Sequence, residues 1–195
     1  MSNLRRGASS RNNPGSVTIA ALIQAPFFKS MEHFDVLIVG AGISGIGAGH
    51  ALQRHCAGKS YAILEGREAI GGTWDLFRYP GVRSDTDMYT LGYSFQPWTK
   101  NESMADGASI LQYVRDTASE HGIDRHVRYG CRVRSAVWSS ERARWTLTVD
   151  ATGATTPQRF SCNFLYLCGG YYDYAQGFAP DIAGREDFTG RESCS

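Results

Sequence analysis

The amino-acid sequence predicts an α/β fold in which a parallel strand–helix–strand unit is followed by antiparallel strands. Phe34–Val39 and Tyr61–Glu65 are short, mainly apolar runs, as in buried strands of a parallel sheet. Between them, Ile43–Cys56 repeats apolar residues at helical spacing. After His126 the period changes to two, which is typical of antiparallel strands.

The rest of the chain predicts a long loop, one helix and a β-meander. Residues 66–100 are rich in glycine and aromatic residues and lack a long periodic run, and loops of this length are usually functional. A helix is expected over 107–121, with Gly122 as its stop. Val133 and Val137 should share one face of their strand. The further strands are expected at 126–129, 131–139, 144–150, 155–162 and 164–168, with a hairpin turn at 139–143.

Composition and charge narrow the functional classes. The chain has 195 residues, of which 42% are hydrophobic, enough for one packed domain, assigned to 31–195. Residues 1–30 carry four basic residues and no acid, and we interpret them as a disordered or wrongly assigned N-terminal extension, with a targeting peptide as the alternative. The remainder has 16 basic and 19 acidic residues, so nucleic-acid binding is not expected.

The cysteine pattern and the apolar runs bear on compartment and membrane association. The five cysteines are odd in number and form no C-x-x-C pair, which argues against a disulfide framework and against a metal site. This usage favours a cytoplasmic protein. No apolar run approaches the roughly 20 residues of a membrane helix, so stable membrane insertion is not expected.

A glycine fingerprint stands where the first strand meets the first helix. In Gly40-Ala-Gly42-Ile-Ser-Gly45 the first glycine permits a tight turn, the second admits a pyrophosphate, and the third allows close helix–strand packing. The free N–H groups and the positive end of the helix dipole would then face the phosphates. Glu65 closes the second strand and can accept hydrogen bonds from a ribose. Its charge disfavours a 2′-phosphate, and therefore NADP(H), in this pocket.

The fingerprint fits both FAD and NAD, so the choice depends on the residues that follow. Gly71 and Gly72 stand shortly after Glu65. A second glycine pair near the pyrophosphate suits a longer ligand whose ring system continues past the first turn. An NAD dehydrogenase would more often continue directly into regular βα units. FAD is therefore favoured.

Several motifs together resemble the class B flavoprotein monooxygenases of the Baeyer–Villiger type. The resemblance implies a Rossmann-like FAD-binding domain of the two-dinucleotide-binding-domain flavoprotein type. It also implies an NADPH-dependent monooxygenase in which a peroxyflavin inserts oxygen beside a ketone or oxidises a sulfur. The expected partners are dioxygen and a small ketone, thioether or thioamide. The matching motifs are 40–45, 60–65, 71–85, 87–92 and 167–172.

The resemblance also implies roles for residues around the expected phosphate and adenosine site. Glu65 would hold the adenosine ribose, and Val133 would meet the adenine through its backbone. Gly40, Gly42, Ser44 and Gly45 would contact the FAD phosphates. Other cofactor-binding residues would follow the second glycine pair: Gly72, Thr73, Trp74, Asp75 and Leu76.

Arg83, Ser84 and Asp85 would sit near the flavin and the nicotinamide, and Asp85 is the catalytic candidate. In the family this acid positions an active-site arginine, and a carboxylate beside a flavin can orient such a cation electrostatically. The alternative for Asp85 is a loop aspartate that caps nearby backbone amides. Trp74 could equally be a packing residue.

The family's later features are expected to be absent from this chain. Phe188-Thr-Gly190 begins a further family fingerprint, but Cys194 stands at its histidine position. We therefore expect a domain incomplete at its C-terminus, without most of the NADPH site and without the substrate domain, and inactive alone. The alternatives are a non-catalytic flavin-binding remnant and a protein resembling FAD amine oxidases.

Overall fold

The computed structural model describes residues 31–174 and 180–190. The expected N-terminal extension, 1–30, and Cys194 lie outside the described residues. The strands are β1 Glu32–Val39, β2 Tyr61–Leu64, β3 Val127–Arg128, β4 Cys131–Ser139, β5 Arg144–Ala151 and β6 Gln158–Leu167. The α-helices are α1 Ile43–His55, α2 Thr73–Leu76, α3 Met88–Leu91 and α4 Gly107–Glu120, and short 3₁₀ turns cover Asp124–His126 and Arg185–Asp187.

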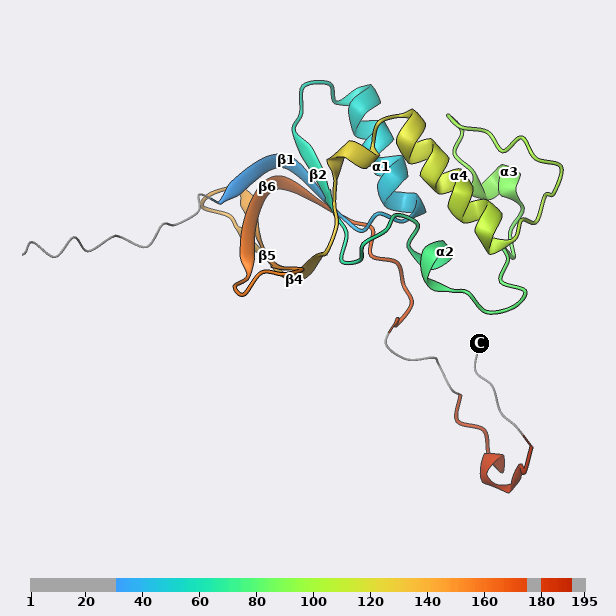
Figure 1. Cartoon of the computed structure of the whole chain (residues 1–195). Coiled ribbons are helices and arrows are strands. Elements are labelled where there is room, and N and C mark those ends of the chain that lie inside the picture. The colour runs from blue at the N-terminus through green and yellow to red at the C-terminus, as the bar shows by residue number, and fades with distance from the viewer. Residues whose placement is uncertain (1–30, 175–179, 191–195) are drawn as a thin grey trace, which may run out of the picture. The chain divides into compact units, whose positions relative to one another are not determined.

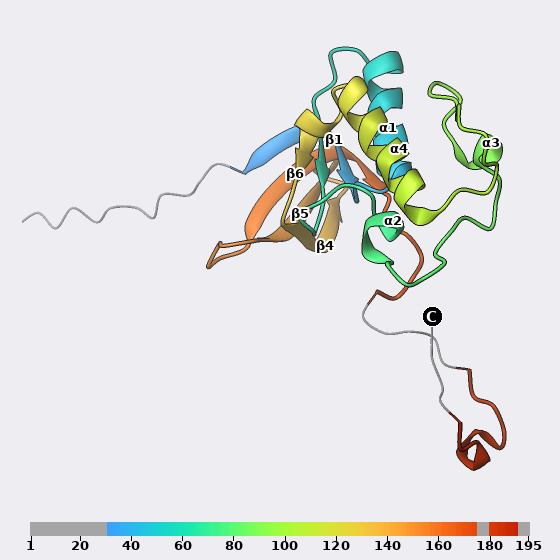
Figure 2. The same cartoon turned by 45° about the vertical axis from the view of Figure 1, so that its right-hand side comes forward.

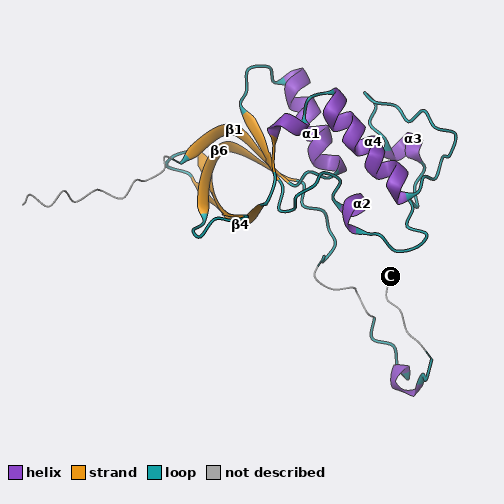
Figure 3. Ribbon diagram, in the orientation of Figure 1, coloured by secondary structure: helices purple, strands orange, loops and turns teal. Residues whose placement is uncertain are grey.

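The six described strands form one mixed sheet in the order β3-β2-β1-β6-β5-β4 (Figures 1 and 3). Strands β3, β2, β1 and β6 run parallel, whereas β6, β5 and β4 form an antiparallel meander. The expected strand–helix–strand unit and the β-meander are both confirmed. The carboxyl ends of the parallel strands and the N-terminus of α1 therefore lie at the same edge of the sheet.

Strand β6 joins the two parts of the sheet, and here the sequence-based prediction is wrong. Two strands were expected, at 155–162 and 164–168, but the chain continues as one strand over Gln158–Leu167. It pairs with β1 from Phe160 opposite Glu32 to Leu167 opposite Val39. Only its first half also pairs with β5. The apolar pattern changes within β6 because its neighbours change, not because the strand ends.

A β-bulge in β4 corrects a second expectation. Val133 and Val137 were expected to share a face, but the register with β5 shifts between Val133 and Ser135. One extra residue moves the following side chains to the opposite face. Ala136 therefore packs against the core beside Val133, while Val137 is 63% exposed.

Two hydrophobic clusters cover the two faces of the parallel strands. Ile38 of β1 and Ile63 of β2 pack with Ile46 of α1 and Val114 of α4. Leu37 of β1 and Leu64 of β2 point to the other face, where they pack with residues of the meander that include Leu147 and Phe160. Figure 2 shows α1 and α4 side by side on one face of the sheet. This two-sided burial explains the continuous apolar runs of β1 and β2.

The long aromatic segment that follows β2 packs mainly against α4. Tyr113 of α4 donates its hydroxyl to the carbonyl of Gln96 and accepts the N–H of Tyr93. Met88 is fully buried, and the Trp98 indole donates to the carbonyl of Glu102.

The helix predicted over 107–121 is confirmed as α4, and Gly122 follows it with a φ of +62°. Among the described residues, no helix is both long and apolar enough to cross a membrane.

Candidate functional site: a dinucleotide-sized groove

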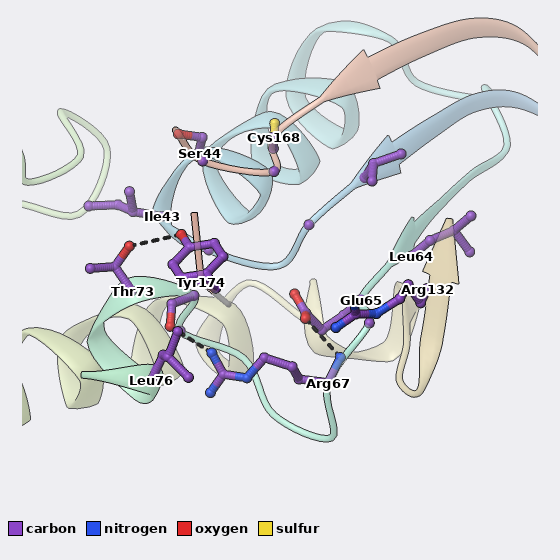
Figure 4. Close-up of a pocket in the computed structure, with 18 of the residues that line it drawn as sticks. Ile43, Ser44, Leu64, Glu65, Arg67, Thr73, Leu76, Arg132, Cys168 and Tyr174 are labelled. Carbon is purple, nitrogen blue, oxygen red and sulfur yellow. Dashed lines mark hydrogen bonds between the residues drawn. The ribbon is translucent and has the colours of Figure 1, made fainter. Parts of the chain in front are cut away.

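A groove of about 650 Å³ lies beyond the carboxyl ends of β1, β2 and β6 (Figure 4). This volume falls within the range of about 300–1,000 Å³ that is usual for cofactor sites. The lining comes from the turns after β1, β2 and β6, from α2 and from the start of β4. In parallel α/β sheets, ligands bind at this edge.

The first glycine turn has no room for side chains at Gly40 and Gly45. Gly40 adopts a φ of +102°, and a Cβ there would lie 2.4 Å from the carbonyl oxygen of Cys168. A Cβ at Gly45 would lie 1.9 Å from the carbonyl oxygen of Gly40. Gly40 lines the groove, but Gly45 packs behind the turn. The predicted requirement for glycine at these two positions thus has a direct steric cause.

The N-terminus of α1 opens into this groove. Its N-cap is Gly42, which offers no side-chain cap, and the first turn contains no acid. Ile43 and Ser44 of this turn line the groove. The first N–H groups of a helix have no partner within the helix, and the helix dipole makes this end positive. The arrangement presents donors and partial positive charge to an anionic ligand.

A second glycine turn lies directly against the first. The N–H of Gly71 donates to the carbonyl of Ala41 at 3.0 Å. Gly72 has a φ of +54°, and a Cβ there would come within 3.1 Å of the Cα of Gly42. The positive φ and the tight approach at Gly72 favour glycine there, whereas a Cβ at Gly42 would make an ordinary contact, 3.6 Å from the Cα of Gly72. The second glycine pair is thus part of the same groove, as the sequence indicated.

Glu65 lines the groove with a carboxylate that already accepts backbone hydrogen bonds. Its Oε2 accepts the N–H of Ala41 at 2.7 Å, and its Oε1 accepts the N–H of Arg67 at 3.0 Å. The residue is 8% exposed. Each carboxylate oxygen has two lone pairs, so acceptor capacity toward the groove remains. Glu65 therefore connects the first glycine turn to the end of β2.

The predicted cofactor-binding residues divide into three groups. The largest group lines the groove: Gly40, Gly42, Ser44, Glu65, Gly72, Thr73, Trp74, Leu76 and Val133. Gly45 supports the turn from behind, and Asp75 points toward three arginines instead. The third group is the segment Arg83–Asp85, which does not contribute to the lining.

The segment around Asp85 is held by local contacts. Ser84 is 2% exposed, donates its hydroxyl to the carbonyl of Thr86 and accepts the N–H of the same residue. Asp85 is exposed and accepts the Thr86 hydroxyl at 3.4 Å. The pKa of Tyr172 is raised, chiefly by its hydrogen bond with Tyr171, with smaller contributions from burial and from the charge of Asp85. Asp85 therefore lies close enough to Tyr172 for its charge to affect that residue.

Some lining residues were not among the predicted site residues. Gly169 and Gly170 follow an apolar run, as Gly40 does, and this signal could have found them, although Phe164 and Leu167 in that run are exposed. Arg67, Arg132 and Tyr174 carry no comparable pattern. Cys131 and Cys168 also line the groove, and burial raises the pKa of both thiols.

Comparison with known proteins identifies the class of fold first. Residues 38–103 match the family described as NAD(P)-binding Rossmann-like domain. This match covers the end of β1, α1, β2 and both glycine turns. The predicted Rossmann-like α/β fold is therefore confirmed.

The relatives then show which longer proteins the chain is similar to. The chain is 57% identical over 159 residues to the FAD-containing monooxygenase EthA of Mycobacterium tuberculosis, and 52% identical over 162 residues to the putative FAD-containing monooxygenase MymA of the same species. Each match covers 82% of this chain and 32% of the relative. The chain is thus a homologue of the FAD-containing monooxygenases and spans about a third of the length of the curated relatives it matches.

Solved structures agree with this assignment. An oxidized steroid monooxygenase bound to NADP has a TM-score of 0.65 and 33% identity, over 72% of this chain and 26% of that one. The OTEMO complex with FAD and NADP has a TM-score of 0.65 and 31% identity, over 80% of this chain and 29% of that one. The resemblance to Baeyer–Villiger monooxygenases is confirmed.

Proposed function

We propose that the groove binds FAD, with the pyrophosphate over the N-terminus of α1 and the adenosine ribose beside Glu65. The observation that carries this proposal is the uncapped helix start enclosed by two glycine turns in contact. Anionic phosphates need N–H donors and close backbone approach, and both are present. The relatives named FAD-containing monooxygenases support FAD over other dinucleotides.

The fit to FAD rests on this chain's own residues. Gly42 and Gly72 leave space that a Cβ at either position would reduce, and Ser44 adds a hydroxyl at the helix start. Arg67 and Arg132 add positive charge to the lining, which suits a diphosphate. Val133 stands at the β4 side, where the adenine would reach its backbone.

For the whole protein we propose an NADPH-dependent monooxygenase that uses dioxygen on a small ketone or on a thioether or thioamide. When bound, the flavin supplies the redox and oxygen-activation chemistry, while this chain binds and orients its adenylate end. Asp85 remains a catalytic candidate, as a positioning residue for an arginine elsewhere in the protein. We place the reaction in the cytoplasm, which the four free thiols among the described cysteines favour.

The proposal is tested by titrating the purified chain with FAD, ADP and FMN. FAD should bind at one site per chain, with a change in flavin fluorescence. ADP should displace it because ADP carries the adenylate pyrophosphate, whereas FMN lacks that part and should compete poorly. Binding of FMN as tight as that of FAD, or no binding of FAD, would refute the proposed site.

A further inference from the structure

Asp75 is a buried carboxylate surrounded by three guanidinium groups. Its side chain is 6% exposed, and it pairs with Arg67, with Arg115 at 2.9 Å and with Arg78 at 3.4 Å. Arg67 comes from the loop after β2, Arg78 follows α2, and Arg115 belongs to α4. A buried carboxylate needs such compensation, since it loses its hydration on burial.

Arg67 connects this cluster to both sides of the groove. Its Nη1 donates to the carbonyl of Gly72 at 3.0 Å, and its Nη2 pairs with Asp75. Its backbone N–H donates to Glu65. Figure 4 shows its side chain extending from beside Glu65 toward Leu76 of α2. One residue thus ties the acid at the end of β2 to the second glycine turn.

We propose that Asp75 is a positioning residue for the dinucleotide groove and acts through Arg67. Asp75 fixes the guanidinium of Arg67 against the Gly72 carbonyl, and this contact holds the second glycine turn against Gly42. The inference rests on the proposed FAD site. Asp75 does not line the groove, so its contribution is the preset spacing between the two turns and not a contact with the cofactor.

The direction in which FAD affinity changes when Asp75 is removed distinguishes a positioning role from a purely electrostatic one. A carboxylate near a diphosphate repels it, so removal of a merely nearby acid would strengthen FAD binding. Removal of an acid that positions other residues should instead weaken FAD binding. Without Asp75, three guanidinium groups of like charge would separate and the Gly72 turn would lose its anchor. Preorganised sites bind more tightly because they pay less ordering entropy, so FAD binding should weaken.

The test compares Asp75→Asn and Arg67→Gln with Asp116→Asn as the matched control. Asp116 is an exposed acid of α4, next to Arg115 in sequence, whose described contact is the amide of Gln112. Asp75→Asn and Arg67→Gln should each weaken FAD binding about tenfold, an effect of the size seen at metal sites when a residue that orients a metal ligand is changed. The double variant should lose less than the product of the two single losses, because the two residues share the Arg67–Asp75 contact, although Arg67→Gln also removes a positive charge from the lining. Asp116→Asn should stay within twofold of the unchanged chain.

A second measurement follows local opening of the two glycine turns in the absence of FAD. Amide hydrogen exchange at 40–45 and 71–72 should accelerate in Asp75→Asn and Arg67→Gln, but not in Asp116→Asn. Arg67→Gln leaves Asp75 paired with Arg78 and Arg115. If Asp75→Asn does not fold, Arg67→Gln therefore still tests the inference. Unchanged exchange in the folded variants, or FAD binding as tight as that of the unchanged chain, would overturn the inference. If the unchanged chain itself does not bind FAD, the proposed function fails, while the exchange data still decide whether Asp75 sets the turns.

Discussion

The two long helices of the described chain begin in opposite ways. Helix α4 starts at Asp106, whose carboxylate accepts the N–H and the hydroxyl of Ser109, both at 2.9 Å. The N-cap of helix α1 is Gly42, which has no side chain that could accept hydrogen bonds from the first turn. The backbone is extended at both N-caps, with φ and ψ of −69° and 158° at Asp106 and −78° and −170° at Gly42.

This difference shows which helix start is available to a ligand. The short α3 also begins at an aspartate, Asp87, which accepts the N–H of Thr90. An acid at the N-cap satisfies the open donors and adds negative charge, so it would exclude an anion. The helix that faces the groove has glycine at this position. The absence of a cap at α1 therefore has a functional explanation, although an aspartate would fit its backbone.

The largest effect is expected where the glycine turn meets α1 from behind. Gly45→Ala should lower the free energy of unfolding by about 3 kcal/mol or more, because the new Cβ collides with backbone at Gly40. Chemical denaturation measures this. Gly169→Ala is the control, since nothing lies within 4 Å of its Cβ position, and it should change stability by less than about 0.5 kcal/mol. Equal stability of the two variants would contradict the steric account.

Gly42→Asp would make α1 begin as α4 does. The extended backbone at Gly42 accepts an aspartate, and its Cβ would make only an ordinary contact, 3.6 Å from the Cα of Gly72. We expect unchanged or slightly higher thermal stability, because the new carboxylate caps the helix. FAD affinity should fall about 100-fold, since the same carboxylate occupies the donors and repels the phosphates. Gly42→Asn, which caps without charge, should show a smaller loss, and retained affinity in Gly42→Asp would break the comparison.

The reverse change at α4 should affect stability alone. Asp106→Ala removes the cap and should cost about 1 kcal/mol of unfolding free energy. FAD affinity should not change, because Asp106 does not line the groove. Thermal unfolding and the FAD titration on one preparation decide this. A parallel loss of affinity would mean that the two helix starts are not independent.

The smallest effect is a pH dependence of the α4 cap. Hydrogen bonds from Ser109, its backbone N–H first, lower the pKa of Asp106. A carboxyl group whose pKa is lowered by folding contributes stability above its unfolded pKa and loses it as the pH falls through the folded value. The stability difference between the unchanged chain and Asp106→Ala should thus be constant near neutrality and shrink below about pH 4. A difference that stays constant down to about pH 2 would exclude this titration.

The sequence predicts the strand–helix–strand unit well because local signals agree there. Apolar runs, helical spacing and the glycine fingerprint all specify the turn at Gly40. The single strand β6 and the bulge in β4 escape prediction because they depend on pairing partners far away in sequence. The change of neighbours along β6 resembles a strand boundary, and the extra residue after Val133 has no sequence signature.

The same limit applies to the site. Glycines and Glu65 stand at fixed distances from the strands, so their place at the groove follows from local pattern. Asp75 was expected beside the cofactor, but its arginine partner in α4 lies 40 residues away. Side-chain direction in the short helix α2 is decided by that tertiary contact. The role of Asp85 stays a prediction, because its described interactions are a hydrogen bond from Thr86 and an effect of its charge on Tyr172.

The most direct test of the central claim is a heteronuclear NMR titration of the chain with ADP and with FAD. The claim is that backbone amides at the start of α1 bind the pyrophosphate of a flavin dinucleotide. The amide signals of 42–45 and 71–72 should shift and saturate together, while those of the β4–β5 hairpin turn stay in place. Saturable FAD binding that leaves the amides of 42–45 unmoved would contradict the account.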